Sequence, residues 1–150
     1  MAFILAIETT TKNCSVALFE NEQLLALKEH CSDDYSHAEQ LTLFITEVLQ
    51  KTQLTLKNIN AIALSKGPGS YTGLRIGTST AKGLCYSLGI PLISISTLKA
   101  MAYGIASIEN FELFCPMIDA RRMEVFSAVY DKENKEIRAV KADIVNNQTY

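Results

Sequence analysis

A buried strand, a glycine-rich break and a long helix follow one another directly between residues 59 and 88. Ile59–Ser65 is a short apolar run, which is typical of a strand inside a sheet. Gly67-Pro68-Gly69 ends that run, and Tyr71–Leu88 has helical spacing despite three internal glycines. A strand that leads through a turn into a helix is expected in an α/β fold.

The surrounding segments extend this pattern on both sides. Apolar runs predict strands at 3–8, 14–19, 23–30 and 92–96, and amphipathic spacing predicts helices at 37–52 and from Thr97 to about 107. Ser36 and Glu39 fit a capping box at the start of the first helix. Short polar connections make the first three strands an antiparallel meander, and right-handed crossovers place the later strands parallel to the first strand. The sequence therefore predicts a mixed sheet with helices on its faces.

The last third of the chain changes character. Phe111–Ile118, Glu124–Tyr130 and Glu136–Val140 are predicted strands joined by polar turns, and no helical pattern follows them. We expect a complete first domain over residues 1–108 and the opening strands of a second, incomplete domain over residues 109–150. We also expect that the chain is truncated or that another subunit supplies the missing half.

Composition restricts the classes of function. Fourteen Lys and Arg residues oppose sixteen Asp and Glu residues, and the signs are interspersed, so strong binding to a phosphate backbone by this chain alone is not predicted. The start of the chain lacks the basic leader of a signal peptide and no run spans a bilayer, which predicts a soluble, cytoplasmic protein without membrane contact. Four widely spaced cysteines favour buried reduced thiols over a zinc cluster or disulfides.

The glycine-rich break is the strongest candidate for a ligand site. A helix start presents free N–H groups and the positive end of the helix dipole, which suit a phosphate or carboxylate. The candidate phosphate-binding residues are Gly67, Gly69, Ser70, Tyr71 and Thr72. The segment is not a Walker A loop, because Lys66 precedes the glycines. A tight turn that needs glycine dihedrals explains the same residues, and both interpretations remain open.

The long helix carries two neighbouring stripes. Leu74, Ala81, Cys85 and Leu88 are expected to lie on the sheet, whereas Gly73 and Gly77 let another helix approach closely. That helix belongs either to this chain, at 37–52, or to another subunit. The predicted partner interface comprises His37, Leu41, Phe44, Val48, Gly73, Ile76, Gly77, Thr80 and Leu84.

Residues for catalysis are few. A second metal-binding histidine on the helix face of His37 would stand at position 41, which is Leu41, so we predict no metal site. Glu8 ends the first strand without a second carboxylate nearby in sequence. Arg121 and Arg122 are candidates for contact with an anion. No Gly-x-Ser-x-Gly motif is present, and no catalytic residue is assigned.

Three segments together resemble the TsaB (YeaZ) family of glycoprotease-like proteins. They are Ile4–Thr10, Gly67–Gly77 and Pro116–Phe126, in this order and spacing. The resemblance implies an actin/ribonuclease-H-like (ASKHA) fold and a place in the complex that forms threonylcarbamoyladenosine in tRNA. It implies a non-catalytic subunit that dimerises with the catalytic paralogue TsaD, works with the ATPase TsaE, and meets tRNA only through the complex.

From the two helices we also expect a homodimer when TsaD is absent, and we predict no cofactor, with ATP binding by this chain left open. Three other functions are kept as alternatives on the residues. A small ATP-binding transferase or hydrolase would use Gly67–Gly73, and a glycoprotease-type metallopeptidase would need metal ligands that the sequence does not supply. A direct tRNA-binding module is the third alternative, and the acidic balance disfavours it.

Overall fold

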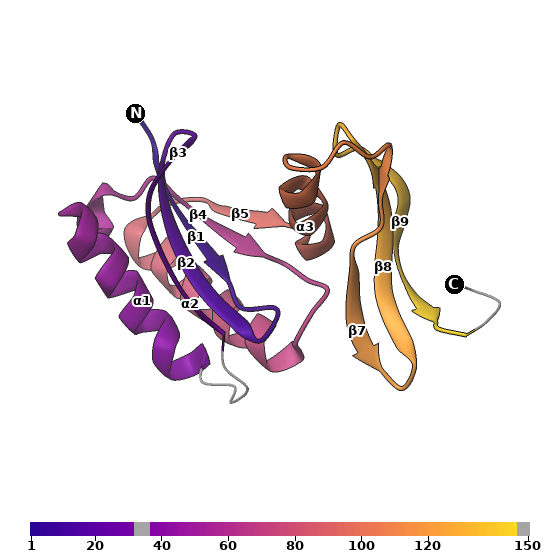
Figure 1. The fold of residues 1–150 in the computed structure, drawn as a ribbon. Coiled ribbons are helices and arrows are strands. Elements are labelled where there is room, and N and C mark those ends of the chain that lie inside the picture. The colour runs from indigo at the N-terminus through magenta and orange to yellow at the C-terminus, as the bar shows by residue number, and fades with distance from the viewer. Residues whose placement is uncertain (32–36, 147–150) are drawn as a thin grey trace. The chain divides into compact units, whose positions relative to one another are not determined.

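The computed structural model describes residues 1–31 and 37–146 and divides them into two compact units. The first unit contains Met1–Lys66 and Ser70–Ile95. Its five-stranded sheet has the order β3-β2-β1-β4-β5, as Figure 1 shows. The strands are β1 (Phe3–Glu8), β2 (Asn13–Glu20), β3 (Gln23–Cys31), β4 (Ala61–Ser65) and β5 (Leu92–Ile95). β1, β2 and β3 are antiparallel, whereas β4 is parallel to β1 and to β5, which confirms the predicted mixed sheet.

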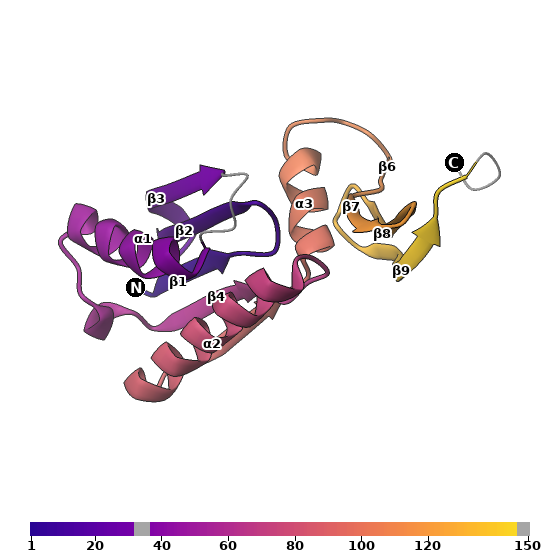
Figure 2. The same cartoon turned by 90° about the horizontal axis from the view of Figure 1, so that it is seen from below.

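Helices α1 (His37–Thr52) and α2 (Tyr71–Leu88) lie side by side on one face of this sheet (Figures 1 and 2). α1 packs against β2 and β3, and α2 packs against β4, β1 and β5. A 3-10 turn at Leu56–Asn58 leads from α1 toward β4. The two helices therefore share one core, and each has a second side that points away from the sheet.

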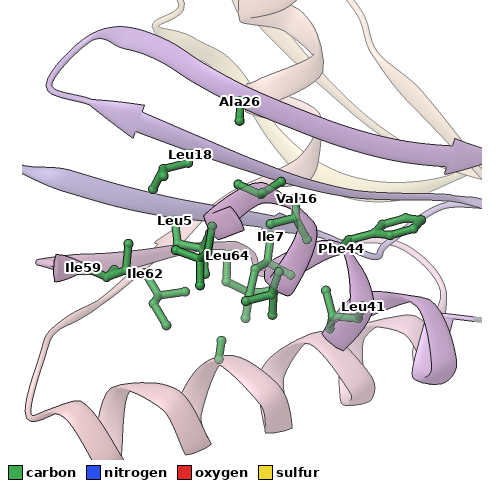
Figure 3. Packing of buried hydrophobic residues seen from close by; sticks show 14 of the residues in the cluster. Leu5, Ile7, Val16, Leu18, Ala26, Leu41, Phe44, Ile59, Ile62 and Leu64 are labelled. Atoms are coloured by element: carbon green, nitrogen blue, oxygen red, sulfur yellow. The ribbon is translucent and has the colours of Figure 1, made fainter. Parts of the chain in front are cut away.

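The core of the first unit follows from the alternating direction of side chains along the strands. Leu5 is paired with Leu18 on one side and with Ile62 on the other, so the three side chains lie on one face of the sheet. Leu41 and Phe44 of α1 reach the same cluster, as Figure 3 shows. Burying side chains of this size stabilises the fold by roughly 1.5–3 kcal/mol each.

The second unit contains Gly67–Gly69 and Ser96–Tyr150. Its elements are α3 (Thr97–Ala106), β6 (Leu113–Phe114), β7 (Met117–Arg121), β8 (Glu124–Asp131) and β9 (Glu136–Ile144). β8 pairs antiparallel with each of the other three strands. Leu98 and Ala102 of α3 pack on Ala128 and Tyr130 of β8. Because of this packing, α3 groups with the second unit, whereas we expected the boundary at residue 108.

Several details differ from the sequence-based expectations. The strand predicted at 111–118 is two strands, because Cys115 and Pro116 separate β6 from β7 and proline has no N–H to donate. Ser96, one residue earlier than expected, caps α3 by accepting a bond from the Lys99 N–H at 3.4 Å. Ser36, the predicted cap of α1, lies outside the described residues. In the part of the chain that is described, no helix is long and apolar enough to cross a membrane.

Candidate functional site

The start of α2 is held by bonds within the first unit. Ser70 is the N-cap, and its hydroxyl accepts from the Gly73 N–H at 3.2 Å. The Ser70 N–H donates to the Thr10 carbonyl at 2.7 Å. Two of the N–H groups that a phosphate would need are therefore already bonded. Tyr71 and Thr72, also predicted for this site, are exposed.

Gly67 and Gly69, the other candidate phosphate-binding residues, group with the second unit. Gly67 is buried at a φ of 102°, and its carbonyl accepts from the Thr97 N–H at 3.0 Å. A φ of this sign favours glycine, so the turn alone requires the residue. Phosphate binding at this segment stays a prediction.

The β1–β2 turn packs against α2. The Thr9 hydroxyl donates to the Gly73 carbonyl at 2.8 Å, and Thr9 is fully buried. The Glu8 carboxylate accepts from both the N–H and the hydroxyl of Thr10, each at 2.5 Å. One oxygen of Glu8 is therefore occupied by its own turn.

The glycine stripe of α2 faces inward, toward the sheet, whereas we expected a helix of this chain or of another subunit to approach it. Gly73 and Gly77 are buried together with Ala81 and Cys85. A Cβ on Gly77 would meet the Thr9 hydroxyl first and the Leu64 Cδ1 atom at 3.2 Å. The missing side chain thus makes room for the β1–β2 turn and for β4, and Gly73 and Gly77 do not lie on the surface.

Most of the predicted interface on α1 also belongs to the core. Leu41, Phe44 and Val48 are between 1% and 6% exposed and pack in the first unit's cluster. They were assigned to an interface because helical spacing marks an apolar face without saying what covers it. His37 begins α1, and its side chain lies outside the described part. On α2, Leu84 is packed against the same core, and Ile76 and Thr80 are half-buried.

The exposed side of α2 carries a different set of residues, which we call the outer stripe. Helical geometry places five positions within about 80° of the helix circumference. The outer stripe consists of Tyr71, Arg75, Ser79, Lys82 and Tyr86, all of them exposed. Tyr71 and Tyr86 have 74% and 94% of their surface exposed. Sequence reasoning missed this stripe as a unit, although its spacing of three and four residues was a readable signal.

The cations of the outer stripe lack acidic neighbours on their own helix. The Arg75 guanidinium lies over the Tyr71 ring, with 5.6 Å between its carbon Cζ and the ring centroid. Across residues 1–31 and 37–146, no ion pair includes Arg75 or Lys82. No Asp or Glu occurs anywhere in α2. The stripe therefore presents two uncompensated positive charges between two tyrosines.

A shallow groove runs beside the outer stripe. Its volume is about 450 Å³, and it is lined by Ala38 of α1 and by Tyr71, Thr72, Arg75, Ile76, Ser79 and Thr80 of α2. Ile76 and Thr80 are the two predicted interface residues that line this groove. An exposed aromatic and cationic helix face beside a groove has the composition of a protein-binding surface.

The remaining candidate residues do not converge on a reaction centre. Among the described residues, no group of three His, Cys, Asp or Glu side chains is placed to hold a metal ion. Arg121 and Arg122 are exposed at the β7–β8 turn, both at positive φ, and the Arg121 N–H donates to Asp119 Oδ1 at 2.7 Å. Contact of these arginines with an anion stays a prediction.

The cysteines divide into two pairs. Cys14 and Cys85 are buried, whereas Cys31 and Cys115 are exposed, so the expectation of four buried thiols was wrong for two of them. Burial raises the pKa of the Cys14 thiol, and the nearby Glu8 carboxylate raises it further. Burial also raises the pKa of Cys85, against a smaller lowering by a backbone hydrogen bond from Ile62. These buried thiols are protonated at neutral pH and are poor nucleophiles.

Comparison with known proteins adds sequence relatives. Residues 33–149 match the family described as TsaD: tRNA N6-adenosine threonylcarbamoyltransferase. The chain is 37% identical over 134 residues to the tRNA threonylcarbamoyladenosine biosynthesis protein TsaB of Escherichia coli, covering 89% of this chain and 57% of that protein. It is 32% identical to TsaB of Bacillus subtilis, covering 93% of this chain and 60% of that protein. It therefore spans less than two thirds of the length of these relatives.

A solved structure agrees with these matches. YeaZ from Pseudomonas aeruginosa superposes with a TM-score of 0.84 at 29% identity, covering 97% of this chain and 68% of that one. The sheet order, with three antiparallel strands followed by two parallel strands and helices, defines an α/β protein of the actin/ribonuclease-H-like class. Within that class, the chain belongs to the TsaB (YeaZ) family.

Proposed function

We propose that this protein is a non-catalytic subunit in the synthesis of threonylcarbamoyladenosine in tRNA and that it acts by binding the catalytic paralogue TsaD. The identity to TsaB proteins over most of the chain carries this proposal. In it, TsaE joins the assembly, tRNA is met only through the complex, and the location is the cytoplasm. Binding of two copies to each other through the same helices, more weakly than the binding of TsaD, is the state that we expect when TsaD is absent.

Two features of the first unit support a role without chemistry of its own. The residue four positions after His37 is Leu41, which is 1% exposed and lies in the apolar core rather than beside a metal. The Glu8 carboxylate is engaged by the backbone and hydroxyl of Thr10. A metal ion at Leu41 would have to displace packing in the core, and one oxygen of Glu8 is already used by its own turn.

The outer stripe and the adjacent groove are the docking surface in this proposal. Tyrosine and arginine are among the side chains that most often dominate binding energy at protein interfaces. Both types are exposed on α2, and the groove beside them accepts side chains of a partner. The inward glycines have an indirect role, because they let α2 lie close to the sheet.

Truncation of the two tyrosines tests the docking surface. The double variant Tyr71→Ala, Tyr86→Ala should bind TsaD at least about tenfold more weakly, because each substitution removes an aromatic anchor. Binding is measured by calorimetry with purified TsaD, and threonylcarbamoylation of tRNA is assayed with TsaC, TsaD and TsaE present. The matched control is Tyr103→Ala, since Tyr103 is also well exposed, at 65%, but lies on α3.

The binding and modification assays test the docking surface and the proposed function separately. Loss of binding and stimulation in the double variant, but not in the control, supports the proposal. Unchanged binding of TsaD by the double variant rejects the outer stripe as the docking surface. Absence of any effect of the unaltered chain on TsaD-dependent modification rejects the proposed function itself.

A further inference from the structure

The outer stripe has an internal symmetry that the proposed function does not use. Tyr71 and Tyr86 are equally distant from a midpoint between Thr78 and Ser79, and Arg75 and Lys82 share the same midpoint. A second copy that packs antiparallel on α2 about this point therefore places each residue against a defined counterpart. Tyr71 faces Tyr86 of the other copy, and Arg75 faces its Lys82.

Pairing of two copies along this stripe thus places cations opposite each other. Because of the two-fold axis, the contact between Arg75 and Lys82 occurs twice. The two positions lie roughly 5 Å from the midpoint along the helix axis, given a rise of about 1.5 Å per residue. At this distance from the crossing point, helices that pack at an angle of about 20° are still in contact. No acidic residue of α2 is available to relieve the repulsion.

The acidic residues of α1 do not change this conclusion. Glu47 is bonded to Lys28 of β3 at 2.7 Å and lines a groove on the β3 side of α1. Glu39 lies in the first turn of α1 and is exposed. A dimer in which α1 of one copy covers α2 of the other is a different arrangement, and the variants below distinguish it from an α2–α2 contact.

We propose that Arg75 and Lys82 select the partner of the outer stripe by charge: the stripe binds a helix that carries carboxylates and disfavours a second copy of this chain. The proposal rests on the outer stripe being the docking surface. Like charges across an interface suppress the wrong partner, and opposite charges accelerate association with the right one. The carboxylates of the partner would lie about 10 Å apart along its helix, as do positions 75 and 82.

Charge reversal of the two positions, singly and together, tests the selection. Lys82→Glu alone places a carboxylate against Arg75 of the other copy, and Arg75→Glu alone places a carboxylate against its Lys82. Both single variants should self-associate at least about tenfold more tightly than the unaltered chain. The double variant restores like charges, now negative, and should return to weak self-association. Lys51→Glu at the end of α1 is the control for net charge and should have no effect.

Sedimentation velocity of the full chain at about 50 mM and about 500 mM salt measures these differences. At high salt the single variants should no longer self-associate more tightly than the unaltered chain. The unaltered chain should self-associate more at high salt than at low salt. Binding of purified TsaD by the unaltered chain should weaken at high salt, and Lys82→Glu should weaken it further at low salt.

The outcomes are distinct from those of the tyrosine test. The α2–α2 geometry and the selection by charge are overturned if the single variants self-associate no more tightly than the unaltered chain. They are also overturned if the double variant self-associates as tightly as the single variants. Stronger binding of TsaD by Lys82→Glu overturns the acidic partner. If the single variants associate as expected while truncation of Tyr71 and Tyr86 leaves TsaD binding intact, then the self-pairing geometry holds and the proposed docking surface fails.

Discussion

Thr9 of the β1–β2 turn lies directly against Gly77 of α2. The Thr9 hydroxyl is the first atom that a Cβ on Gly77 would meet, and the same hydroxyl donates to the carbonyl of Gly73 one helical turn earlier. The turn and the helix are therefore interlocked, and the glycine has a packing role inside the first unit. A conformational requirement does not explain it, because Gly77 is in the middle of a regular helix.

Replacement of Gly77 by alanine should destabilise the protein. Alanine in a helix interior is favoured over glycine by roughly 1 kcal/mol, but overpacking against Thr9 and Leu64 costs about 1–3 kcal/mol. We expect the second effect to win, with a lower midpoint of urea unfolding. Gly83→Ala is the matched control, because nothing lies within 4 Å of its Cβ position in the same helix. It should stabilise by about 0.5–1 kcal/mol, and a similar loss in both variants would contradict this account.

This contact also explains why Gly73 and Gly77 were wrongly assigned to the predicted interface. Spacing alone shows that Gly73 and Gly77 share a face of α2, but it cannot say whether a strand of the same chain or another protein meets that face. The close approach of Thr9, distant in sequence, settles the question. The exposed residues of α2 are instead polar and aromatic ones, such as Arg75 and Tyr86, which the sequence analysis did not single out.

Phe44 and Glu47 on α1 should respond to mutation very differently. Phe44 is 6% exposed in the core, so Phe44→Ala should cost about 3–5 kcal/mol. Glu47 forms an ion pair with Lys28, but both side chains are about half exposed, and Glu47→Gln should change stability by less than about 0.5 kcal/mol. Denaturant unfolding measures both. A large effect of Glu47→Gln would mean that the pair is shielded from solvent more than its exposure implies.

The four cysteines should fall into two classes toward iodoacetamide. The exposed Cys31 and Cys115 should be alkylated in the folded protein, whereas Cys14 and Cys85 should be protected by burial and by their raised pKa, which keeps them as thiols below that pKa. In urea all four should react. Peptide mass spectrometry identifies the modified residues, and native labelling of Cys14 would contradict the burial of the β1–β2 turn.

Most of the fold was predictable because its signals are local. The short apolar runs of β1 and β2 predict those two strands, and the capping serine and the glycine at the other end predict the bounds of α2. The break at Pro116 was misread because an apolar run hides a change of strand. The grouping of α3 with β8 was missed for a related reason. Packing between segments that are distant in sequence does not produce a periodic sequence pattern in either segment.

A cluster of charged residues in the second unit is expected to stabilise its sheet. Asp143 of β9 is bonded to Arg138 Nη1 at 2.8 Å and to Lys141 Nζ at 2.9 Å, and its carboxylate also accepts from the hydroxyl of the buried Ser127. The Asp143 side chain is only 11% exposed. Asp143→Asn removes the charge that both cations share, and we expect a loss of about 1–3 kcal/mol.

Lys141→Gln is the control for this prediction, because the Lys141 side chain is 57% exposed and its pair should contribute less than about 1 kcal/mol. The cluster lies in the second of the two units, so the measurement has to distinguish that unit from the first one. Hydrogen exchange of the β8 and β9 amides is therefore the appropriate measurement. Faster exchange in both strands of Asp143→Asn, with β1 and β2 unchanged, assigns the cluster to the stability of the second sheet. Equal exchange in the two variants would show that Asp143 adds nothing beyond a surface ion pair.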